Sequence, residues 1–503
     1  IIVNLTAGLI GMGDGLVKGS LIAGLMVIFL LLSSSPLSAG QVTYNQEYLK
    51  AILQFIDDNY YQEVDFEKLN TETVQTIFSS LDPYTRFFTH EEAAEFLDYV
   101  SGDYQGIGVV LLERDNKILI KQVMESSPAA RCGILPGDRI TKVDNINVAH
   151  ATIEEVAELV RGEIGTEVTV ELLRGDQRLI YKIVRSEIIM NPVYSDMREE
   201  IAYIYIESFN AHTQPFLDKT LKQAAEEKVN HIILDLRDNS GGSVQQAVEV
   251  SRYFVPRGLI TRLDFGAEDV KDIYYYSYLD VSSYKLVVLV DEGTASAAEI
   301  LAGAVQDSDA GILIGNKTFG KARVQDFMAM LSPQAYSRYR ERYAINSVDP
   351  RKLPQNEWEA LSDEDMLGWV KMTTGIYYTP KGRNIDGQGL KPDIEVLSGE
   401  IPGVWLQAIP PLAQIEKPEL NSISNEVETA ENILLLAGYE IDEPDTFLDE
   451  RTYEAIKKFQ ADKGLYPYGV LDFSTQKELN RTLNSLQVEH DPVYARAVEW
   501  LGE

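Results

Sequence analysis

Residues 285–306, KLVVLVDEGTASAAEILAGAVQ, decide the fold class of this chain. An apolar run ends at Val290, and a helical pattern begins after Ser296. The same change from buried strand to helix recurs between Ile201 and Val396, where the strands IAYIYI, HIILDL and GILIG alternate with helical segments. Such alternation predicts an α/β layer whose strand ends are free to hold chemical groups.

Three other stretches of the chain differ in pattern from this region. Residues 104–186 contain β-branched runs such as GIGVVLLE and TEVTVELLR, with two helical patterns between them, which predicts a small β domain. Farther on, four prolines space a stretch that three helical patterns follow, as in a linker and a small helical unit. The predicted order is a signal peptide or membrane anchor (1–40), an N-terminal helical region (41–103), the β domain (104–186), the α/β core (187–398), a linker (399–425) and a helical domain (426–485).

In one part of the α/β core, the apolar residues follow neither a helical nor a strand period. Residues 330–373 are polar and contain several tyrosines and arginines, which is typical of a surface insertion. Two roles stay open for it, because it could cover a cleft or form contacts between copies of the chain. A homo-oligomer is therefore among the open alternatives.

The composition narrows the classes of function. Against 78 Asp and Glu the chain has only 45 Lys and Arg, and the formal net charge of −33 would repel the phosphates of nucleic acids. The single cysteine, Cys132, cannot form an intramolecular disulfide, and the five histidines lack metal-ligand spacing. We therefore expect no nucleic-acid partner, no metal and no cofactor.

The N-terminal stretch indicates export. An apolar run from Ser20 to Leu32 follows Lys18 and precedes small residues, which is the order of a secretory signal. This run is short for a membrane-spanning helix of about 20 residues. A cut after Ala39 would place bulky Leu37 where a small residue is preferred, so an uncleaved anchor stays open. Either way we expect an extracytoplasmic protein, exported or anchored to the outer face of the cell membrane.

Ser296 and Lys321 each follow a predicted strand. Small residues surround both, with Lys321 between Gly320 and Ala322. Taken alone, the serine fits a helix N-cap and the lysine fits a solvated surface position. Together they fit a Ser/Lys dyad, because burial can lower a lysine pKa from about 10.4 to about 7–8, where the amine can accept a serine proton.

Four separated motifs resemble those of the C-terminal-processing, or tail-specific, serine peptidases. The resemblance spans roughly residues 45–396. It implies an endopeptidase that processes or degrades proteins from or near the C-terminus, without a cofactor, and whose substrates are proteins or peptides with free C-termini. The motifs are LDPYTRFF (81–88), LDLRDNSGG (234–242), GTASAAEILAGA (293–304) with GNKTFGKARVQ (315–325), and YYTPKGRNIDGQGLKPDI (377–394).

The resemblance also implies roles for individual residues. The nucleophile falls on Ser296, the general base on Lys321, and the residue that orients the lysine on Gln325. The oxyanion donors fall on the backbone N–H of Ala297 and of one glycine of the pair Gly241–Gly242. Such donors commonly stabilise the transition state by about 3–4 kcal/mol.

The β domain resembles a PDZ domain. Its YQGIG sequence lies where PDZ domains bind a peptide carboxylate through backbone N–H groups, beside a strand edge that pairs with the peptide. The implied substrate-binding residues are Tyr104, Gly106, Ile107 and Gly108. Arg161 matches an arginine implicated in this family in coupling the PDZ domain to the protease, and an ordinary exposed arginine at a helix end is the alternative.

The C-terminal helical unit resembles a peptidoglycan-binding domain of the three-helix type. The stretch AGYEIDEPDTFLDERTYEAIKKFQADKGLYPYGVLDFSTQKEL carries the motif order of such domains. Ala455, Ile456 and Phe459 would pack any small helical core, so this resemblance is less specific than that of the protease. Peptidoglycan is the implied partner.

The sequence thus predicts a multidomain α/β protein, in which a PDZ-like β domain precedes a Ser/Lys protease core and a small all-α domain follows it. One rival interpretation is a catalytically silent PDZ scaffold tethered to the cell wall, against which the intact dyad argues. Another is a cell-wall hydrolase, for which paired carboxylates and zinc ligands are lacking.

Overall fold

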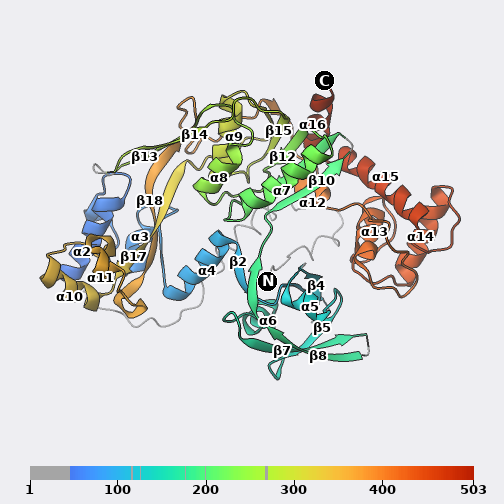
Figure 1. Ribbon diagram of the computed structural model, residues 1–503, viewed down its shortest axis with the longest axis horizontal. Coiled ribbons are helices and arrows are strands. Elements are labelled where there is room, and N and C mark those ends of the chain that lie inside the picture. Colours follow the sequence, from blue (N-terminus) through green and yellow to red (C-terminus); the bar gives the residue numbers. More distant parts are fainter. Residues whose placement is uncertain (1–45, 115–116, 125, 176, 199, 267–269) are drawn as a thin grey trace.

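The computed structural model describes residues 46–503 apart from 115–116, 125, 176, 199 and 267–269 (Figure 1). The predicted signal segment, residues 1–40, lies outside the described residues. Within the described part of the chain, no helix is long and apolar enough to span a membrane.

A six-stranded sheet forms the centre of the α/β core. Its strand order is β10-β11-β12-β15-β16-β19, in which β10 is antiparallel to β11 and the other neighbours run parallel. The carboxyl ends of the parallel strands therefore meet at one edge. The strands are β10 (Val193–Arg198), β11 (Ile201–Ile206), β12 (His231–Asp235), β15 (Lys285–Val290), β16 (Ile312–Gly315) and β19 (Ile394–Glu395).

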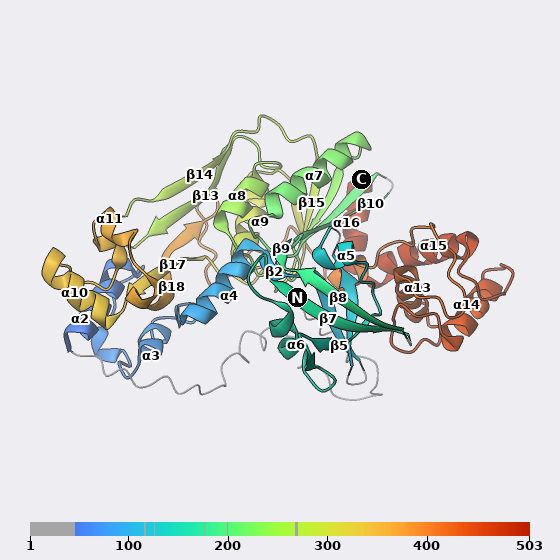
Figure 2. The ribbon, with the colours of Figure 1, turned by 60° about the horizontal axis from the view of Figure 1, so that its bottom comes forward.

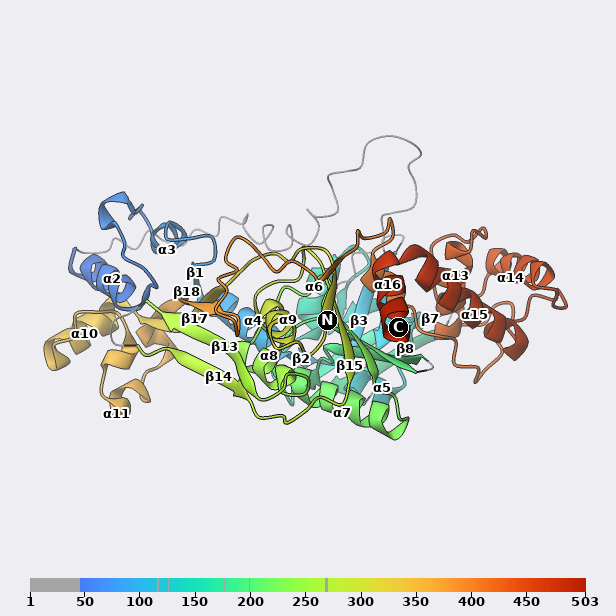
Figure 3. The same cartoon turned by 90° about the horizontal axis from the view of Figure 1, so that it is seen from above.

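Helices cover both faces of this sheet because its strands are apolar on both sides. Ile232, Leu234 and Val288 pack on one face against α7 (Thr213–Glu226), α8 (Val244–Ser251) and α9 (Ala297–Asp307). On the other face, the alternate residues Ile233 and Val287 pack against α16 (Pro492–Gly502), the last helix of the chain (Figure 3). The C-terminal helix thus forms one layer of the α/β core.

A second sheet lies beside the first and is organised around one long strand, β18. On one side β18 pairs with β1 and with β13, and on the other it pairs with β17, which begins two residues after Lys321. The members are β1 (Arg86–Phe88), β13 (Gly258–Phe265), β14 (Ile273–Ser277), β17 (Arg323–Leu331) and β18 (Met366–Tyr378).

The N-terminal helices and residues 330–373 share a hydrophobic core at one end of the molecule (Figure 1). Phe55 and Ile77 pack with Tyr336 and Val348, all of which are buried. The expected surface insertion therefore also contributes buried residues to the core of this lobe. Its helices are α2 (Gln46–Asn59), α3 (Val74–Ser79), α10 (Pro333–Tyr343) and α11 (Gln355–Trp358).

A pair of antiparallel strands connects the PDZ-like domain to the rest of the molecule (Figure 2). The chain reaches the domain through β2 (Asp103–Gly106) and returns from it through β9 (Ser186–Ile189), and we call this pair the stem. Its sheet has the order β3-β4-β5-β7-β8, so β3 is an edge strand. The helix α4 (His90–Ser101) leads from the second sheet into the stem. The domain contains β3 (Val109–Arg114), β4 (Lys117–Val123), α5 (Pro128–Cys132), β5 (Arg139–Val143), β6 (Ile146–Asn147), α6 (Ile153–Val160), β7 (Glu167–Arg174) and β8 (Gln177–Val184).

The C-terminal unit is helical, and its hydrophobic core includes residues that precede the predicted domain start at residue 426. Leu406 and Leu412, from the stretch predicted to be a linker, pack with Phe459 and Leu479. The unit also touches the PDZ domain, since Lys121 and Glu428 lie 3.9 Å apart. Its helices are α12 (Gly403–Gln407), α13 (Asn425–Leu436), α14 (Glu450–Asp462) and α15 (Phe473–His490).

Candidate active site

Ser296 lies between the carboxyl end of β15 and the first turn of α9. Its backbone adopts φ +56° and ψ −117°, a conformation that non-glycine residues rarely take. Such a backbone persists only when the surrounding structure holds it. The candidate nucleophile is therefore presented on a constrained turn rather than on a regular helix.

Glu299 holds this turn and joins it to Lys321. The Ser296 N–H and the Lys321 N–H both donate to Glu299 Oε2, each at 2.9 Å. Glu299 Oε1 accepts from Thr318 Oγ1 at 2.5 Å and from the Gly320 N–H at 2.8 Å. Burial raises the pKa of this carboxyl, and the four hydrogen bonds oppose the rise. One buried carboxylate thus ties the candidate nucleophile to the candidate base.

Tyr377 also joins Ser296 to Lys321, through their carbonyl oxygens rather than their N–H groups. Its hydroxyl lies 3.0 Å from the Ser296 carbonyl oxygen and 2.9 Å from that of Lys321. The side chain is 1% exposed and comes from β18. Both the N–H and the C=O of each residue of the pair are therefore restrained. We call this arrangement of Glu299 and Tyr377 around the two peptide groups the clamp.

The Lys321 side chain lies against the motif LDPYTRFF. Its Nζ is 4.9 Å from the centroid of the Tyr84 ring, and Asp82 accepts the Tyr84 N–H at 2.7 Å. Burial lowers the pKa of the Lys321 ammonium, while the carboxylates of Asp82 and Glu299 raise it. Within the described part of the chain, Lys321 Nζ and Ser296 Oγ make no hydrogen bond with each other.

The other predicted member of the set, Gln325, lies in β17 with its side chain turned elsewhere. Its amide donates to the Arg323 carbonyl at 3.1 Å, and the register of β17 against β18 shifts next to it. Among the described residues, its side chain makes no hydrogen bond with Lys321. Its role in orienting the lysine stays a prediction.

The predicted oxyanion loop packs directly on Ser296. A Cβ on Gly241 would lie 2.8 Å from Ser296 Cβ, and Gly241 has φ +104°, so only glycine fits. The Gly241 N–H donates to Asn239 Oδ1 at 2.9 Å. By contrast, the N–H groups of Gly242 and Ala297 donate to no residue that the structure describes.

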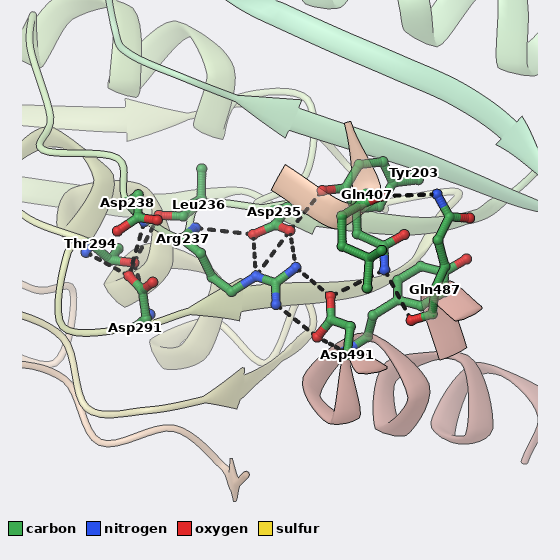
Figure 4. Close-up of polar contacts among 12 residues, drawn as sticks. Tyr203, Asp235, Leu236, Arg237, Asp238, Asp291, Thr294, Gln407, Gln487 and Asp491 are labelled. Carbon is green, nitrogen blue, oxygen red and sulfur yellow. Dashed lines mark hydrogen bonds and ion pairs between the residues drawn. The ribbon is translucent and has the colours of Figure 1, made fainter. Parts of the chain in front are cut away.

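Asp291 fastens this loop to the loop that carries Ser296 (Figure 4). Its Oδ1 accepts the N–H groups of Asp238, Gly293 and Thr294, each at 3.0 Å. Thr294 Oγ1 in turn donates to the Leu236 carbonyl at 2.8 Å. Burial, assisted by the charge of Asp238, raises the pKa of the Asp291 carboxyl to about 6.

The predicted peptide site of the PDZ domain presents two N–H groups. Those of Ile107 and Gly108 donate to nothing in the described part of the chain, while their carbonyls accept from Ala129 at 2.9 Å and from Met124 at 3.0 Å. Tyr104 and Gly106, also predicted for this site, lie in β2 and pair with β9. Since the neighbouring strand β3 is an edge, a peptide could add to the sheet there.

Arg161 lies at the end of α6, facing the stem. Its charge opposes the rise that burial causes in the pKa of Asp98, on α4, and of Tyr104, on β2. A groove of about 440 Å³ lies beside α4 and reaches the start of α8, just after the glycine loop. Its lining residues are Leu97, Asp98, Val100, Ser101, Ala211, Ser243, Gln245 and Gln246.

The sequence analysis missed the residues of the clamp. Glu299 and Tyr377 both stand within quoted motifs, but nothing in their spacing shows that they meet Ser296 and Lys321. The polar character of Glu299 inside the apolar pattern AAEILAGA was the one available signal. Among the described residues, no group of three or more His, Cys, Asp or Glu side chains could hold a metal ion.

Family models match three segments of the chain. The model of peptidase family S41 matches residues 200–396, and those of a PDZ domain and a peptidoglycan binding domain match 119–174 and 424–479. Residues 200–396 are thus similar to the proteins of peptidase family S41. The predicted family and the predicted architecture are therefore confirmed.

Proteins similar to this chain include staphylococcal proteases. A CtpA-like serine protease of Staphylococcus epidermidis is 29% identical over 443 residues, which are 87% of this chain and 82% of that protein. One of Staphylococcus aureus is 27% identical over 461 residues, 91% and 85% of the two chains. A solved photosystem II D1 C-terminal processing protease is 24% identical, with 70% of this chain and 94% of that chain covered and a TM-score of 0.40. The coarse class is a CtpA-like serine protease with a PDZ domain.

The first prediction concerns the clamp. In Glu299→Gln, an amide NH2 would face the N–H groups whose hydrogen bonds the carboxylate now accepts, so the protein should lose about 10- to 100-fold in kcat with little change in KM. Steady-state cleavage of a fluorogenic peptide measures both constants. The control is Glu292→Gln, which alters an exposed glutamate of the loop that precedes α9. A folded Glu299→Gln variant with the wild-type kcat would contradict the assignment.

The second prediction concerns Asp291. Because its folded-state pKa of about 6 exceeds the usual 3.8, ionising the buried carboxyl destabilises the folded state as pH rises from about 4 to about 6. Asparagine keeps the accepting Oδ1 without the charge. Asp291→Asn should therefore raise the free energy of unfolding by about 1–3 kcal/mol at pH 7.5, and by less at pH 5.

Urea denaturation at the two pH values measures this difference. The control is Asp57→Asn, an exposed carboxylate in α2 whose replacement should leave the free energy of unfolding nearly unchanged. A gain for Asp291→Asn that stayed the same at pH 5 and pH 7.5 would argue against the buried charge as its cause.

Proposed function

We propose that this protein is an exported serine endopeptidase that cleaves proteins from or near their C-termini with a Ser296/Lys321 dyad. The observation that carries the proposal is the clamp, because Glu299 and Tyr377 join the backbones of these two residues. Burial of Lys321 adds support, since it lowers the pKa of the amine toward the range of a general base.

The proposed reaction proceeds through an acyl-enzyme. The neutral Lys321 amine takes the Ser296 hydroxyl proton as Oγ bonds to the scissile carbonyl carbon. The N–H groups of Ala297 and of the glycine loop stabilise the oxyanion. The Lys321 ammonium then gives its proton to the leaving nitrogen as the C–N bond breaks. Water hydrolyses the ester with Lys321 as the base, and the proton returns to Ser296 Oγ.

This reaction needs one side-chain movement. Lys321 Nζ lies on the Tyr84 ring rather than on Ser296 Oγ, and a cation over an aromatic face is stabilised in its charged form. Rotation of the lysine toward Ser296 would leave that contact and favour the neutral amine. The arrangement supports a resting site that becomes competent when the side chain turns.

The dyad is tested by alanine variants. Ser296→Ala and Lys321→Ala should each abolish cleavage of casein while circular dichroism stays unchanged, and the double variant should cost little more than either single one, because the two residues act as a unit. Substantial turnover by either folded single variant would rule out the proposed dyad. A wild type without any activity would favour a silent PDZ scaffold.

We further propose that the PDZ domain binds substrate C-termini. The support is the pair of unbonded N–H groups at Ile107 and Gly108 next to an edge strand. A carboxylate there would gain charge-assisted hydrogen bonds, each worth about 1.5–3 kcal/mol. Arg161 lies close enough to Asp98 on α4 and to Tyr104 on β2 for its charge to lower their pKa values, which supports a role in coupling PDZ occupancy to the protease.

The measurement compares one peptide with a free and with an amidated C-terminus. Wild type should cleave the free peptide faster, and Arg161→Ala should lose most of that preference. Arg178→Ala, which removes an exposed arginine from β8 of the same domain, should keep it. Equal rates for the two peptides in wild type would end the proposal of tail recognition. A preference that survives in Arg161→Ala would end only the coupling.

The C-terminal unit leads us to propose an extracytoplasmic location at the cell wall. Its support is the match to a peptidoglycan binding domain at residues 424–479. Because its core includes Leu406 and Leu412, the testable fragment is residues 401–490. This fragment should co-sediment with purified sacculi at low and moderate salt. If it stays in the supernatant, the unit has a structural or protein-binding role instead.

A further inference from the structure

A buried ion network connects the C-terminal helices to the loop that carries the catalytic glycines. Arg237 lies in this loop, and its side chain sits between Asp235 and Asp491 (Figure 4). The guanidinium donates to Asp235 Oδ2 at 2.5 Å, and to Oδ1 and Oδ2 of Asp491 at 2.9 Å each. The exposed fraction is 3% for Arg237, 0% for Asp235 and 1% for Asp491. The contact between Arg237 and Asp491 spans 254 residues of sequence.

Asp491 is itself held firmly. It caps the last helix, α16, by accepting the Tyr494 N–H at 3.1 Å, and it accepts from Gln407 Nε2 at 3.1 Å. A side chain on Gly403 would collide with both Arg237 and Asp491, so the backbone of α12 closes over the ion pair. The carboxylate is therefore a rigid part of the junction between α12, α15 and α16.

Arg237 is equally well connected toward the active site. Its backbone N–H donates to Asp235 Oδ1 at 3.0 Å, and the next residue, Asp238, donates its N–H to Asp291. Asn239 then bonds to the Ala295 N–H at 2.9 Å, next to Ser296. The guanidinium is thus anchored on one side to the C-terminal unit, and on the other to the peptide chain that leads within four residues to Gly241.

We propose that Asp491 is a positioning residue of the active site, which sets the glycine loop from the C-terminal unit through Arg237. The proposal rests on the proposed function, because the loop matters only if its N–H groups stabilise an oxyanion. A guanidinium buried between two carboxylates has all its strong partners in fixed directions. Loss of one of them leaves a buried cation with an unmatched N–H pair, which draws Arg237 and the loop out of place.

This arrangement makes the C-terminal helices part of the catalytic scaffold. The same unit contains the segment that matches a peptidoglycan binding domain and contacts the PDZ domain through Glu428. A displacement of α15 and α16 would therefore move the glycine loop through the buried ion pair between Asp491 and Arg237.

The test is Asp491→Asn in the full chain. Asparagine caps a helix as well as aspartate does, so the variant keeps the α16 cap and removes the charge that faces Arg237. The matched control is Asp472→Asn, which changes the cap of α15 in the same unit without touching the core. Steady-state cleavage of a fluorogenic peptide gives kcat and KM separately.

We expect Asp491→Asn to lower kcat about tenfold or more while KM changes less than about twofold, because a displaced oxyanion donor affects the transition state and not substrate binding. Asp472→Asn should retain the wild-type kcat. A folded Asp491→Asn variant with wild-type kcat, or an equal loss in both variants, overturns the proposal.

Two further arms keep the outcome decisive. If Asp491→Asn does not fold, Gln407→Leu takes its place. It removes the donor to Asp491, together with the bonds of the same amide to Arg198 and to the Gln487 carbonyl, and it leaves the charges of Asp491 and Arg237 intact. Its kcat should fall severalfold with KM unchanged. A wild-type kcat in that variant overturns the proposal. Ser296→Ala is measured in parallel, because activity that persists without Ser296 would refute the proposed function itself.

Discussion

The candidate active site depends on a double restraint of two peptide groups that lie 25 residues apart in sequence. Glu299 accepts the N–H of both Ser296 and Lys321, and the Tyr377 hydroxyl lies within hydrogen-bond distance of both carbonyl oxygens. The backbone of neither residue could shift without breaking its hydrogen bonds to the buried side chains of Glu299 and Tyr377. The side chains keep their freedom, which is what a serine and a lysine need in order to exchange a proton.

Each part of the fold contributes one component of this restraint. The parallel sheet brings the carboxyl ends of β15 and β16 together, so the loops carrying Ser296 and Lys321 become neighbours. The second sheet supplies Tyr377 from β18, and the N-terminal lobe supplies Tyr84 beside the lysine amine. The C-terminal helix, which covers the sheet, supplies Asp491 behind the glycine loop. Several parts of the fold therefore supply residues to the same candidate site.

The sequence predicted the parts of this arrangement that follow from local pattern. Alternation of strand and helix placed Ser296 and Lys321 at neighbouring strand ends, because parallel strands share one carboxyl edge. The resemblance to tail-specific peptidases then selected these residues from other serines and lysines. The PDZ-like domain was likewise visible in its β-branched runs.

The remaining parts arise from contacts between distant segments, which leave no period in the sequence. Tyr377 meets Ser296 across 81 residues, and Asp491 meets Arg237 across 254. Residues 399–425 contain prolines and so resembled a linker, yet Leu406 is fully buried in the helical unit. In the same way the polar surface of residues 330–373 concealed Tyr336 and Val348, which pack on the N-terminal helices.

The most direct test of the clamp is the kinetics of Tyr377→Phe, measured alone and combined with Glu299→Gln. Phenylalanine keeps the ring in its buried site and removes only the hydroxyl that bridges the two carbonyls. The account predicts that kcat falls about tenfold with KM unchanged, and that the double variant loses less than the product of the two single losses, because both groups restrain the same pair. A wild-type kcat in folded Tyr377→Phe, or fully multiplicative losses, would contradict it.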